Sequence, residues 1–382
     1  MDFDLTDEQR LLKDSVDRLI GDAYADFGDR ARFAAEPGGW SRDVWGGYAE
    51  MGLLGLPFEE RFGGFGAGPV EIMLVMEAMG RNLAIEPYLA TVLLGGGLLR
   101  AGGSEAQQAR LVPGIAEGAL TLALAHGERQ ARYDLHDVAA TARREGDGYR
   151  LDGLKSVVLH GEGAGLLVVS ARISGERRDR EGITLFLVEA DAPGVTLQGY
   201  PTQDGQRAAE ISLQDVWVGE EAVLGPLGGG LPLIEQVIAA AIAALAAEAV
   251  GAMDALHTAT VDYLKTRQQF GVPIGSFQVL QHRAVDMMIA VEQARSMALY
   301  GAMMLDAPGP QRDAALSAVK VQVNRSARLV GQGAIQLHGG IGMTMEYKAG
   351  HYFKRLSMIE LMFGDADHHL RRVWEAGGLV AA

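Results

Sequence analysis

The chain of 382 residues contains no cysteine. This absence excludes disulfide bonds, thiolate nucleophiles and thiolate metal ligands. Basic side chains are also scarce, because 34 Lys and Arg stand against 49 Asp and Glu and leave a net charge of −15. Such an acidic excess argues against nucleic acid or an anionic membrane as the general partner, although a local basic pocket for a phosphorylated ligand remains compatible with it.

Two common nucleotide-binding signatures are absent. The glycine-rich stretch "GPLGGGLP" at 225–232 lacks the Lys-Ser/Thr pair of a phosphate loop and follows no strand–helix–strand unit, so we interpret it as an interdomain linker. No G-x-G-x-x-G motif opens a helix after a strand, which argues against a Rossmann dinucleotide site. The amino terminus, "MDFDLTDEQR", is acidic and has no apolar signal core.

Long apolar runs are rare. The stretch "VIAAAIAALAAEAVGAM" is rich in alanine, contains Glu248 and is followed by an amphipathic pattern, so we expect a buried core helix and no membrane span. Apolar residues make up 48% of the chain and charged residues 22%, which is ordinary for a globular protein. These features predict a soluble protein of the cytoplasm.

The pattern of apolar residues divides the chain into regions. Residues 1–119 have helical periodicity: Thr6 and Gln9 form a capping-box pattern at the start of "LTDEQRLLKDSVDRLI", and "VEIMLVMEAMGR" predicts a second helix that ends at Gly80. The apolar residues expected on one face of the first helix are Leu11, Leu12, Val16, Leu19 and Ile20. Helical patterns return at 226–382 and continue almost to the end.

Residues 120–225 have a different pattern. "VAATARREGDGYRLDGLKSVVLHG" contains two β-like runs around "EGDG", a hairpin signal of the Asp-Gly type. "GLLVVSARI", "GITLFLVEA" and "AAEISLQDVWVG" are further β-rich runs bounded by turns. Short strands at this spacing favour a small barrel or sandwich over a parallel βαβ sheet. The sequence therefore predicts an α+β fold that is mainly α, in the order helical, β, helical.

Two segments of the last region carry candidate chemistry. In "YLKTRQQFGVPIGSFQVLQHRAVDMM", a helix is expected to end at Phe270-Gly271, and after a turn through Pro273 a second helix is expected to start near Ser276-Phe277. That corner would gather Arg267, Gln269, Phe270 and Gln278, and a guanidinium beside the free N–H groups of a helix start suits a pyrophosphate. In "QLHGGIGMTMEY", paired glycines permit close backbone approach to a flat or phosphorylated ligand. Each segment alone could be a plain helical corner, but their combination and order behind a β domain are specific.

With these motifs the chain resembles the acyl-CoA dehydrogenase family over nearly its whole length. "FDLTDEQRLLKDSV" and "MGLLGLPFEERFGGFGAG" are similar to the family's amino-terminal segments, and "R.QFG.PI..FQ..QH" and "Q.HGG.G" to its diagnostic carboxy-terminal motifs. "HGGIGMTME", "HYFKRL" and "FGDADHHL" resemble the branch that includes the small subunit of pimeloyl-CoA dehydrogenase and related two-type heterotetramers. The resemblance implies a helical domain (1–119), a middle β domain (120–225) and a four-helix carboxy-terminal domain (226–382), assembled as a tetramer around FAD.

The resemblance also implies how the cofactor is shared. In the family, FAD lies across a subunit boundary: one subunit's β domain holds the isoalloxazine, and the neighbour's carboxy-terminal domain holds the pyrophosphate and adenosine. The positions of this sequence that would take the second role are Arg267, Gln269, Phe270, Ile274, Phe277, Gln278, Gln336, Leu337, Gly339 and Gly340.

The flavin-ring half departs from the family pattern. "GERQARYD" at 127–134 stands where the family usually has "TEP.AGSD", and "KSVVLHG" stands where "K.WIT.G" is common. Gly127 and Tyr133 thus replace hydroxyl side chains, and Val157 and Leu159 replace Trp and Thr, whereas Glu128 and Asp134 are retained. Loss of these donors removes groups that orient a flavin and tune its electronics.

The stretch "MFGDADHHL" at 362–370 stands where many family members carry "IYEGT.EIQ", whose Glu removes the α-proton of the substrate. Phe363 occupies that position, and a phenyl ring cannot accept a proton. The neighbouring Asp365, Asp367, His368 and His369 point in several directions on a helix, which disfavours a metal site. We interpret the stretch as an altered loop and helix cap, with a repurposed acidic site as the alternative.

Glu248 is the remaining candidate base. Some family members carry the base on the first long carboxy-terminal helix, where this chain has Ala241 followed by Ile242. Glu248 lies on nearly the same helical face as Ala241, roughly 10 Å farther along the axis. The alternative is a buried carboxylate paired with a cation on a neighbouring helix, such as Arg283, because a buried Glu needs a partner or a raised pKa.

Three hypotheses follow. The first is a subunit of a heterotetrameric, FAD-dependent acyl-CoA dehydrogenase whose larger partner supplies the flavin-ring contacts and the base. The second is an active homotetramer with Glu248 as base, and the third is a flavin-free structural subunit. The resemblance implies an acyl-CoA substrate, a CoA thioester of a dicarboxylic, branched or ring-bearing acid, and an electron-transferring flavoprotein as acceptor. Neither nucleic acid nor membrane is expected as a partner.

Overall fold

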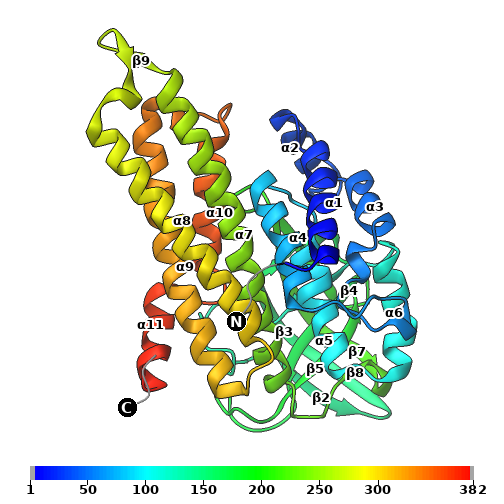
Figure 1. Cartoon of the computed structure of the whole chain (residues 1–382). Coiled ribbons are helices and arrows are strands. Elements are labelled where there is room, and N and C mark those ends of the chain that lie inside the picture. Colours follow the sequence, from blue (N-terminus) through cyan, green and yellow to red (C-terminus); the bar gives the residue numbers. More distant parts are fainter. Residues whose placement is uncertain (1–4, 379–382) are drawn as a thin grey trace. The chain divides into compact units, whose positions relative to one another are not determined.

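The computed structural model describes residues 5–378 (Figure 1). The helices are α1 (Asp7–Ala23), α2 (Phe27–Ala34), α3 (Arg42–Glu50), α4 (Pro69–Asn82), α5 (Gly96–Gly102), α6 (Glu105–Ala116), α7 (Leu231–Thr266), α8 (Gln278–Met304), α9 (Gly309–His338), α10 (Lys348–Leu361) and α11 (Ala366–Glu375). The strands are β1 (Leu122–Ala125), β2 (Thr141–Glu145), β3 (Gly148–Leu159), β4 (Leu166–Arg172), β5 (Ile183–Glu189), β6 (Val195–Pro201), β7 (Arg207–Gly219), β8 (Val223–Leu224), β9 (Gln268–Gln269) and β10 (Val272–Pro273).

The chain forms two compact units, each built from separate stretches of sequence. The helical unit contains the chain up to Ala31, Gly68–Ala84 and the chain from Ile242 onward. The sheet unit contains Arg32–Ala67 and Ile85–Ala241. These units do not follow chain order, so the compact bodies differ from the consecutive regions expected from the sequence, whose boundaries stay a prediction. The mainly helical fold with a middle sheet is confirmed.

In the helical unit, α9 packs against α8, α10 and α11, and α1 packs against α4 (Figure 1). The capping box of α1 is confirmed, because the Gln9 N–H donates to the Thr6 hydroxyl at 3.2 Å and the Thr6 N–H donates to the Gln9 amide oxygen at 3.0 Å. Val16 and Ile20 are buried as expected, but Leu11 is 68% exposed. The inward face of α1 is therefore narrower than its apolar pattern predicted.

A pair of glycines brings α4 and α7 together at backbone distance. A Cβ at Gly80 would lie 1.9 Å from the carbonyl oxygen of Glu248, and a Cβ at Gly251 would lie 1.9 Å from the carbonyl oxygen of Glu77. The expectation that Gly80 ends the helix is wrong, since α4 continues to Asn82. Gly80 is needed for close helix packing and not for helix termination.

Helix α7 is the apolar helix foreseen in the sequence. The span Gly230–Thr266 is long and apolar enough to cross a membrane by length and composition, but 78% of its most apolar window is buried within the protein. That burial is typical of a core helix. The pattern of alanine and larger apolar residues therefore reflects packing on several sides of α7.

The sheet unit contains an eight-stranded sheet in the order β6-β7-β3-β2-β4-β5-β8, with β1 paired to β4. All pairs are antiparallel except β1–β4 and the single β2–β4 pair, so the predicted absence of a parallel βαβ sheet is confirmed. The predicted hairpin joins β2 to β3 through Gly146-Asp147, with Glu145 opposite Gly148. Its first turn residue is Gly146 at φ +62°, so the turn has glycine before aspartate.

Candidate functional site

The two carboxy-terminal motifs meet at one end of the helical unit. Tyr263, near the end of α7, and His338, the last residue of α9, have ring centroids 4.6 Å apart. The chain runs from Tyr263 into Arg267 and the β9–β10 hairpin, and from His338 into Gly339-Gly340. Segments separated by about 70 positions in the sequence therefore form one surface at this end, which we call the nucleotide end.

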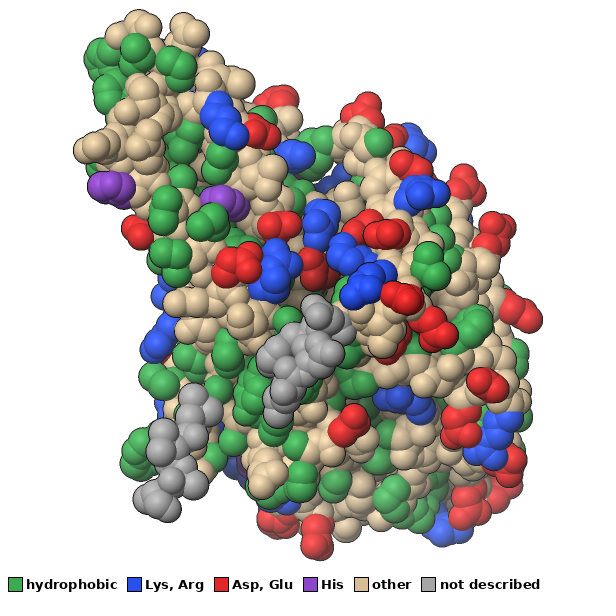
Figure 2. Space-filling view, in the orientation of Figure 1, with side chains coloured by type: hydrophobic (Ala, Val, Ile, Leu, Met, Phe, Trp, Pro, Cys, Tyr) green, Lys and Arg blue, Asp and Glu red, His purple; other side chains and the backbone are tan. Residues whose placement is uncertain are grey.

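The first motif contains a short hairpin where the sequence predicted only a turn between two helices, and the next helix, α8, begins at Gln278 with Phe277 as its N-cap. Helix α7 ends at Thr266, earlier than expected, and Val272 pairs with Gln269 across a turn at Phe270-Gly271. Phe270 has φ +54° and is 91% exposed, and its ring lies 6.2 Å from that of Phe277. The hairpin projects beyond the helices (Figure 1), and hydrophobic side chains lie among other atoms at its tip (Figure 2).

The polar members of the first motif are available to a ligand. Arg267, Gln269 and Gln278 are exposed, and Ile274 is half-buried. The Ile274 N–H donates to the Arg267 carbonyl at 2.8 Å, which ties the base of the hairpin. The backbone of Arg267 is therefore fixed by this hydrogen bond. Within residues 5–378 the guanidinium of Arg267 forms no ion pair with another side chain. A free guanidinium suits a pyrophosphate.

The second motif lines a groove of about 310 Å³ between the end of α9 and α10. The lining residues are Gln332, Ile335, Gln336, Gly339 and Phe353. Sequence reasoning missed Gln332, Ile335 and Phe353. The i, i+4 spacing of Gln332 and Gln336 on one helix is a signal that could have found the former, but Phe353 comes from α10 and only the tertiary fold brings it here.

The glycines and Leu337 have different environments. Gly339 has φ +61°, a conformation that favours glycine, and no atom lies within 4 Å of a Cβ built at Gly339 or Gly340. Leu337 is only 6% exposed, so its side chain belongs to the core and only its backbone can face a ligand. The open glycine backbone beside the carboxamides of Gln332 and Gln336 permits close approach of a flat or phosphorylated ligand, and the FAD contacts expected of these residues stay a prediction.

In the sheet unit, the segments that match the family's flavin-ring motifs contain a buried ion pair. Glu128 is buried, and its carboxylate accepts from the Lys155 ammonium at 2.6 Å and from the N–H groups of Ala139 and Ala140 at 2.8 and 3.1 Å. Burial raises the pKa of Glu128, but the charge of Lys155 and these hydrogen bonds outweigh it and the pKa is lowered. The retained Glu128 and the Lys of "KSVVLHG" thus form a structural pair inside the sheet.

The Glu210 carboxylate accepts hydrogen bonds from the segment of β3 that departs from the family's flavin-ring motif. Its carboxylate accepts from the Ser156 hydroxyl at 2.9 Å, the Val157 N–H at 3.3 Å and the Tyr200 hydroxyl at 3.0 Å. Val157 has φ +54° where the β3–β7 register is irregular, and its side chain is 54% exposed. Donors beside the positions that match the family's flavin-ring motif are therefore satisfied within the chain.

The loop at 362–365 is a helix cap, as predicted. Asp365 caps α11 by accepting from the His368 N–H at 2.8 Å. His369 is fully buried between the Ser317 hydroxyl at 3.2 Å and the Phe363 carbonyl at 3.0 Å, and burial lowers its pKa to about 3. Within residues 5–378 no three His, Asp or Glu side chains are grouped as metal ligands. At the position where the family motif has its Glu, this loop carries Phe363.

Glu248 is a buried carboxylate with a cationic partner. Its Oε1 and Oε2 atoms accept from Nε and Nη2 of Arg355 at 2.5 and 2.8 Å, and both side chains are about 5% exposed. The suggested partner Arg283 is wrong, because that side chain is exposed and Arg355 of α10 makes the pair. The base role of Glu248 stays a prediction, and this pairing weighs against it, since both oxygens are already bound.

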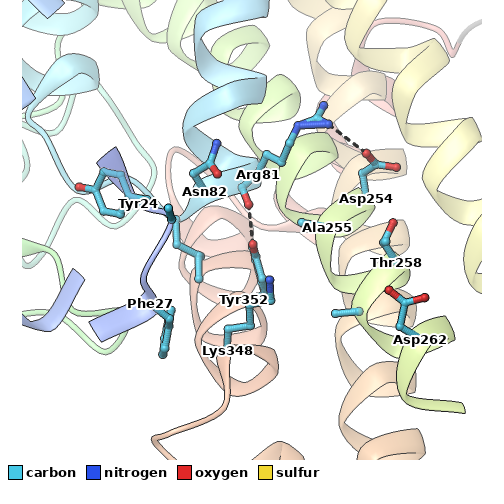
Figure 3. Close-up of a pocket in the computed structure, with 13 residues that line it drawn as sticks. Tyr24, Phe27, Arg81, Asn82, Asp254, Ala255, Thr258, Asp262, Lys348 and Tyr352 are labelled. Carbon is cyan, nitrogen blue, oxygen red and sulfur yellow. Dashed lines mark hydrogen bonds and ion pairs between the residues drawn. The ribbon is translucent and has the colours of Figure 1, made fainter. Parts of the chain in front are cut away.

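A further cavity of about 390 Å³ lies within the helical unit (Figure 3). Arg81 projects toward Asp254 at its upper edge, 3.3 Å apart, and the Tyr352 hydroxyl donates to the Arg81 carbonyl (Figure 3). Asp262 and Lys348 lie at other edges. None of the site residues expected from the sequence lines this cavity. The Tyr352–Arg81 contact does, however, fix the first turns of α10 on the end of α4.

Comparisons with known proteins agree with these features. The chain matches the amino-terminal, middle and carboxy-terminal domains of acyl-CoA dehydrogenases at residues 6–119, 123–216 and 228–377. It is 29% identical to the probable acyl-CoA dehydrogenase YngJ of Bacillus subtilis, over 96% of this chain and 97% of that protein.

Two solved structures resemble the whole chain. The Tcur3481–Tcur3483 steroid acyl-CoA dehydrogenase has a TM-score of 0.86 at 29% identity, covering 97% of both chains. The ChsE4–ChsE5 complex from Mycobacterium tuberculosis has a TM-score of 0.87 at 26% identity, covering 100% of both chains. The chain therefore belongs to the acyl-CoA dehydrogenase family of FAD-dependent oxidoreductases, which act on the CH–CH bond of acyl-CoA thioesters.

Proposed function

We propose that this chain is one subunit of a two-type, FAD-dependent acyl-CoA dehydrogenase that introduces an α,β double bond into an acyl-CoA thioester. Its nucleotide end contributes the pyrophosphate and adenosine half of an FAD site, and a larger partner subunit supplies the flavin-ring contacts and the base. The proposal rests on a contrast between two parts of the chain. The nucleotide end is exposed and open, whereas the hydrogen-bond donors Ser156 and Val157, in the segment that matches the flavin-ring motif, already donate to Glu210.

The residues of this chain have defined tasks in that arrangement. Arg267 would pair with the pyrophosphate, and Gln336 with Gln332 would bind polar groups of the nucleotide in the groove above Phe353. A bound FAD would supply the acceptor for the hydride that leaves the β-carbon of the substrate. Phe363 cannot take the α-proton, and Glu248 is engaged by Arg355, so the base is assigned to the partner.

A tetramer of two chain types is part of the proposal. The relative ChsE4–ChsE5 is a complex of two chains, which supports this assembly. The outer face of α8 exposes Val285, Met288 and Ile289 by 49, 48 and 48% of their surface. Adjacent exposed apolar side chains of this size suit a subunit interface.

The substrate and acceptor also belong to the proposal. The steroid named for the Tcur3481–Tcur3483 relative supports the ring-bearing alternative among the expected acyl groups. An electron-transferring flavoprotein as acceptor, a cytoplasmic location, and the absence of nucleic acid and membrane partners stay predictions from the sequence.

The test is co-expression with a larger acyl-CoA dehydrogenase encoded beside this chain, followed by purification, an absorbance spectrum and assay of dehydrogenation. We expect flavin and turnover in the complex, little of either in this chain alone, and loss of flavin from a complex that carries Arg267→Ala. Stoichiometric FAD with full turnover in the isolated chain would establish the active homotetramer instead. A purified complex without FAD at any interface would establish the structural subunit.

A further inference from the structure

His338 lies between two tyrosines at the nucleotide end. Its ring centroid is 4.6 Å from that of Tyr263 on α7 and 5.0 Å from that of Tyr347, which precedes α10. The side chain is only 3% exposed although it directly precedes Gly339 and Gly340, which are exposed. A buried imidazole therefore anchors the backbone just before the open glycines.

The hydrogen bonds of His338 determine its tautomer. Nδ1 lies 2.9 Å from the carbonyl oxygen of Ala334, and a carbonyl can only accept, so Nδ1 carries the proton. In the neutral ring Nε2 is then an acceptor, and the Tyr347 hydroxyl donates to it at 3.2 Å. Burial lowers the pKa of His338, which agrees with the neutral form. In the hydrogen bond between these two side chains, Tyr347 is therefore the donor and His338 Nε2 the acceptor.

This bond closes the segment that carries the glycines. The short 3-10 turn Gly339–Met343 leaves α9, and the chain returns at Tyr347 to the residue from which it left. Most of its side chains are exposed, including Met343 and Met345 at 73 and 61%, whereas Gly342 is buried and the Met345 carbonyl lies 3.0 Å from His351 Nε2 of α10. Farther along, Tyr352 fixes α10 to the Arg81 carbonyl (Figure 3). The path of the glycine backbone therefore depends on a few contacts, of which the Tyr347–His338 hydrogen bond is the one made to the residue directly before Gly339.

We propose that Tyr347 is a positioning residue for the nucleotide half of the cofactor site: by donating to His338 it holds the Gly339-Gly340 backbone in the shape that receives the pyrophosphate and adenosine. The inference rests on the proposed function and adds a residue that touches no cofactor itself. Preorganisation of a binding loop strengthens binding because the ordering entropy is lost before the ligand arrives.

The test compares Tyr347→Phe with Tyr263→Phe in the full chain, purified in complex with its partner subunit and freed of FAD. Tyr347→Phe keeps the ring against His338 and removes only the donor, and Tyr263→Phe is the matched control because its recorded contact is through the ring. ADP, which carries only the adenosine and pyrophosphate, is titrated by calorimetry, and hydrogen exchange is followed at residues 339–346. We expect ADP affinity to fall about fivefold to tenfold in Tyr347→Phe, the size of one net hydrogen bond, and to change less than about twofold in Tyr263→Phe.

Two readouts separate positioning from general stability. Amides at 339–346 should exchange faster in Tyr347→Phe and regain protection with ADP, at an unchanged melting temperature. In the complex with its partner, kcat at saturating FAD should be unchanged while the FAD concentration for half-maximal activity rises. Unchanged ADP affinity in Tyr347→Phe, together with weakened binding in Arg267→Ala, would overturn the inference and leave the proposed function standing. Absence of ADP binding by the FAD-free complex of the unmodified chain and its partner, or unchanged binding in the complex that carries Arg267→Ala, would overturn both.

Discussion

Arg355 on α10 holds both carboxylate oxygens of Glu248 on α7, with N–O distances of 2.5 and 2.8 Å. Both partners are almost completely buried. A charge in such a place is stable only while its partner is present, because desolvation of an isolated ion costs several kcal/mol. The pair therefore joins two helices and leaves Glu248 poorly suited to accept a substrate proton.

Removal of one partner should destabilise the chain much more than removal of both. We expect Glu248→Ala to lower the free energy of unfolding by about 3–5 kcal/mol, and the double variant Glu248→Leu with Arg355→Leu to recover most of that loss. Urea unfolding of the single and double variants measures both. If Glu248→Gln abolished turnover without lowering stability, Glu248 would be the base and the structural assignment would be wrong.

The crossing of α4 and α7 should not tolerate a methyl group. Gly80→Ala places a Cβ 1.9 Å from the Glu248 carbonyl oxygen, so the helices must separate. We expect a loss of about 3 kcal/mol or more in the free energy of unfolding. Gly21→Ala in α1 is the control, since nothing lies within 4 Å of its Cβ, and it should gain about 0.5–1 kcal/mol through helix propensity. Equal effects of the two substitutions would contradict the close packing.

Stability should decline in mild acid because of His369. An imidazole in the unfolded chain titrates near about pH 6.5, whereas burial lowers the pKa of His369 to about 3 in the folded chain. Between these values the unfolded state binds more protons, so the free energy of unfolding falls as pH falls from about 6.5 toward 3. His369→Gln keeps an N–H for the Phe363 carbonyl and cannot titrate.

We expect a shallower pH dependence for His369→Gln than for the parent chain, measured by urea unfolding at a series of pH values. The exposed His282→Gln is the matched control. His126, in the sheet unit, has its pKa lowered to about 3 by burial and contributes a slope of the same sign, so some dependence should persist. A slope in His369→Gln equal to that of the parent would show that His369 does not contribute.

The exposed apolar face of α8 should mediate assembly. Ile289→Asp places a charge in a patch that the proposed tetramer would bury, so we expect a lower molar mass by light scattering with unchanged helix content. Leu11→Asp is the control, because Leu11 is an exposed apolar side chain on a different helix, α1. A tetramer that withstands Ile289→Asp would place the interface on another surface.

Features that depend on neighbouring residues could be predicted from the sequence. The capping box of Thr6 and Gln9, the hairpin at Gly146 and the cap at Asp365 involve residues within a few positions of each other, and all three are present. The hairpin at 268–273 was missed because its strands have two residues each, too few for an alternating pattern.

Features that depend on residues far apart in the sequence could not be predicted from it. Glu248 and Arg355 are 107 positions apart, and a buried carboxylate accepts any cation that the fold brings within reach, so its charge alone could not select Arg355 over Arg283. Glu210 likewise lies 54 positions from Ser156, and the β3–β7 register decides that it meets that hydroxyl. Gly80 looked like a helix terminator because glycine weakens helices, and only the approach of α7 reveals its packing role.

By itself the sequence determined the mainly helical architecture, because residue periodicity is a local property of the chain, and its motifs sufficed to indicate the family by resemblance. The tertiary structure alone decided that the motifs at 263–278 and 336–340 share one end of the helical unit, and that Glu248, Glu128 and Glu210 are occupied by partners inside the chain. The physical reason is that hydrogen bonds and ion pairs act over a few ångströms, so folding and not sequence distance chooses the partners.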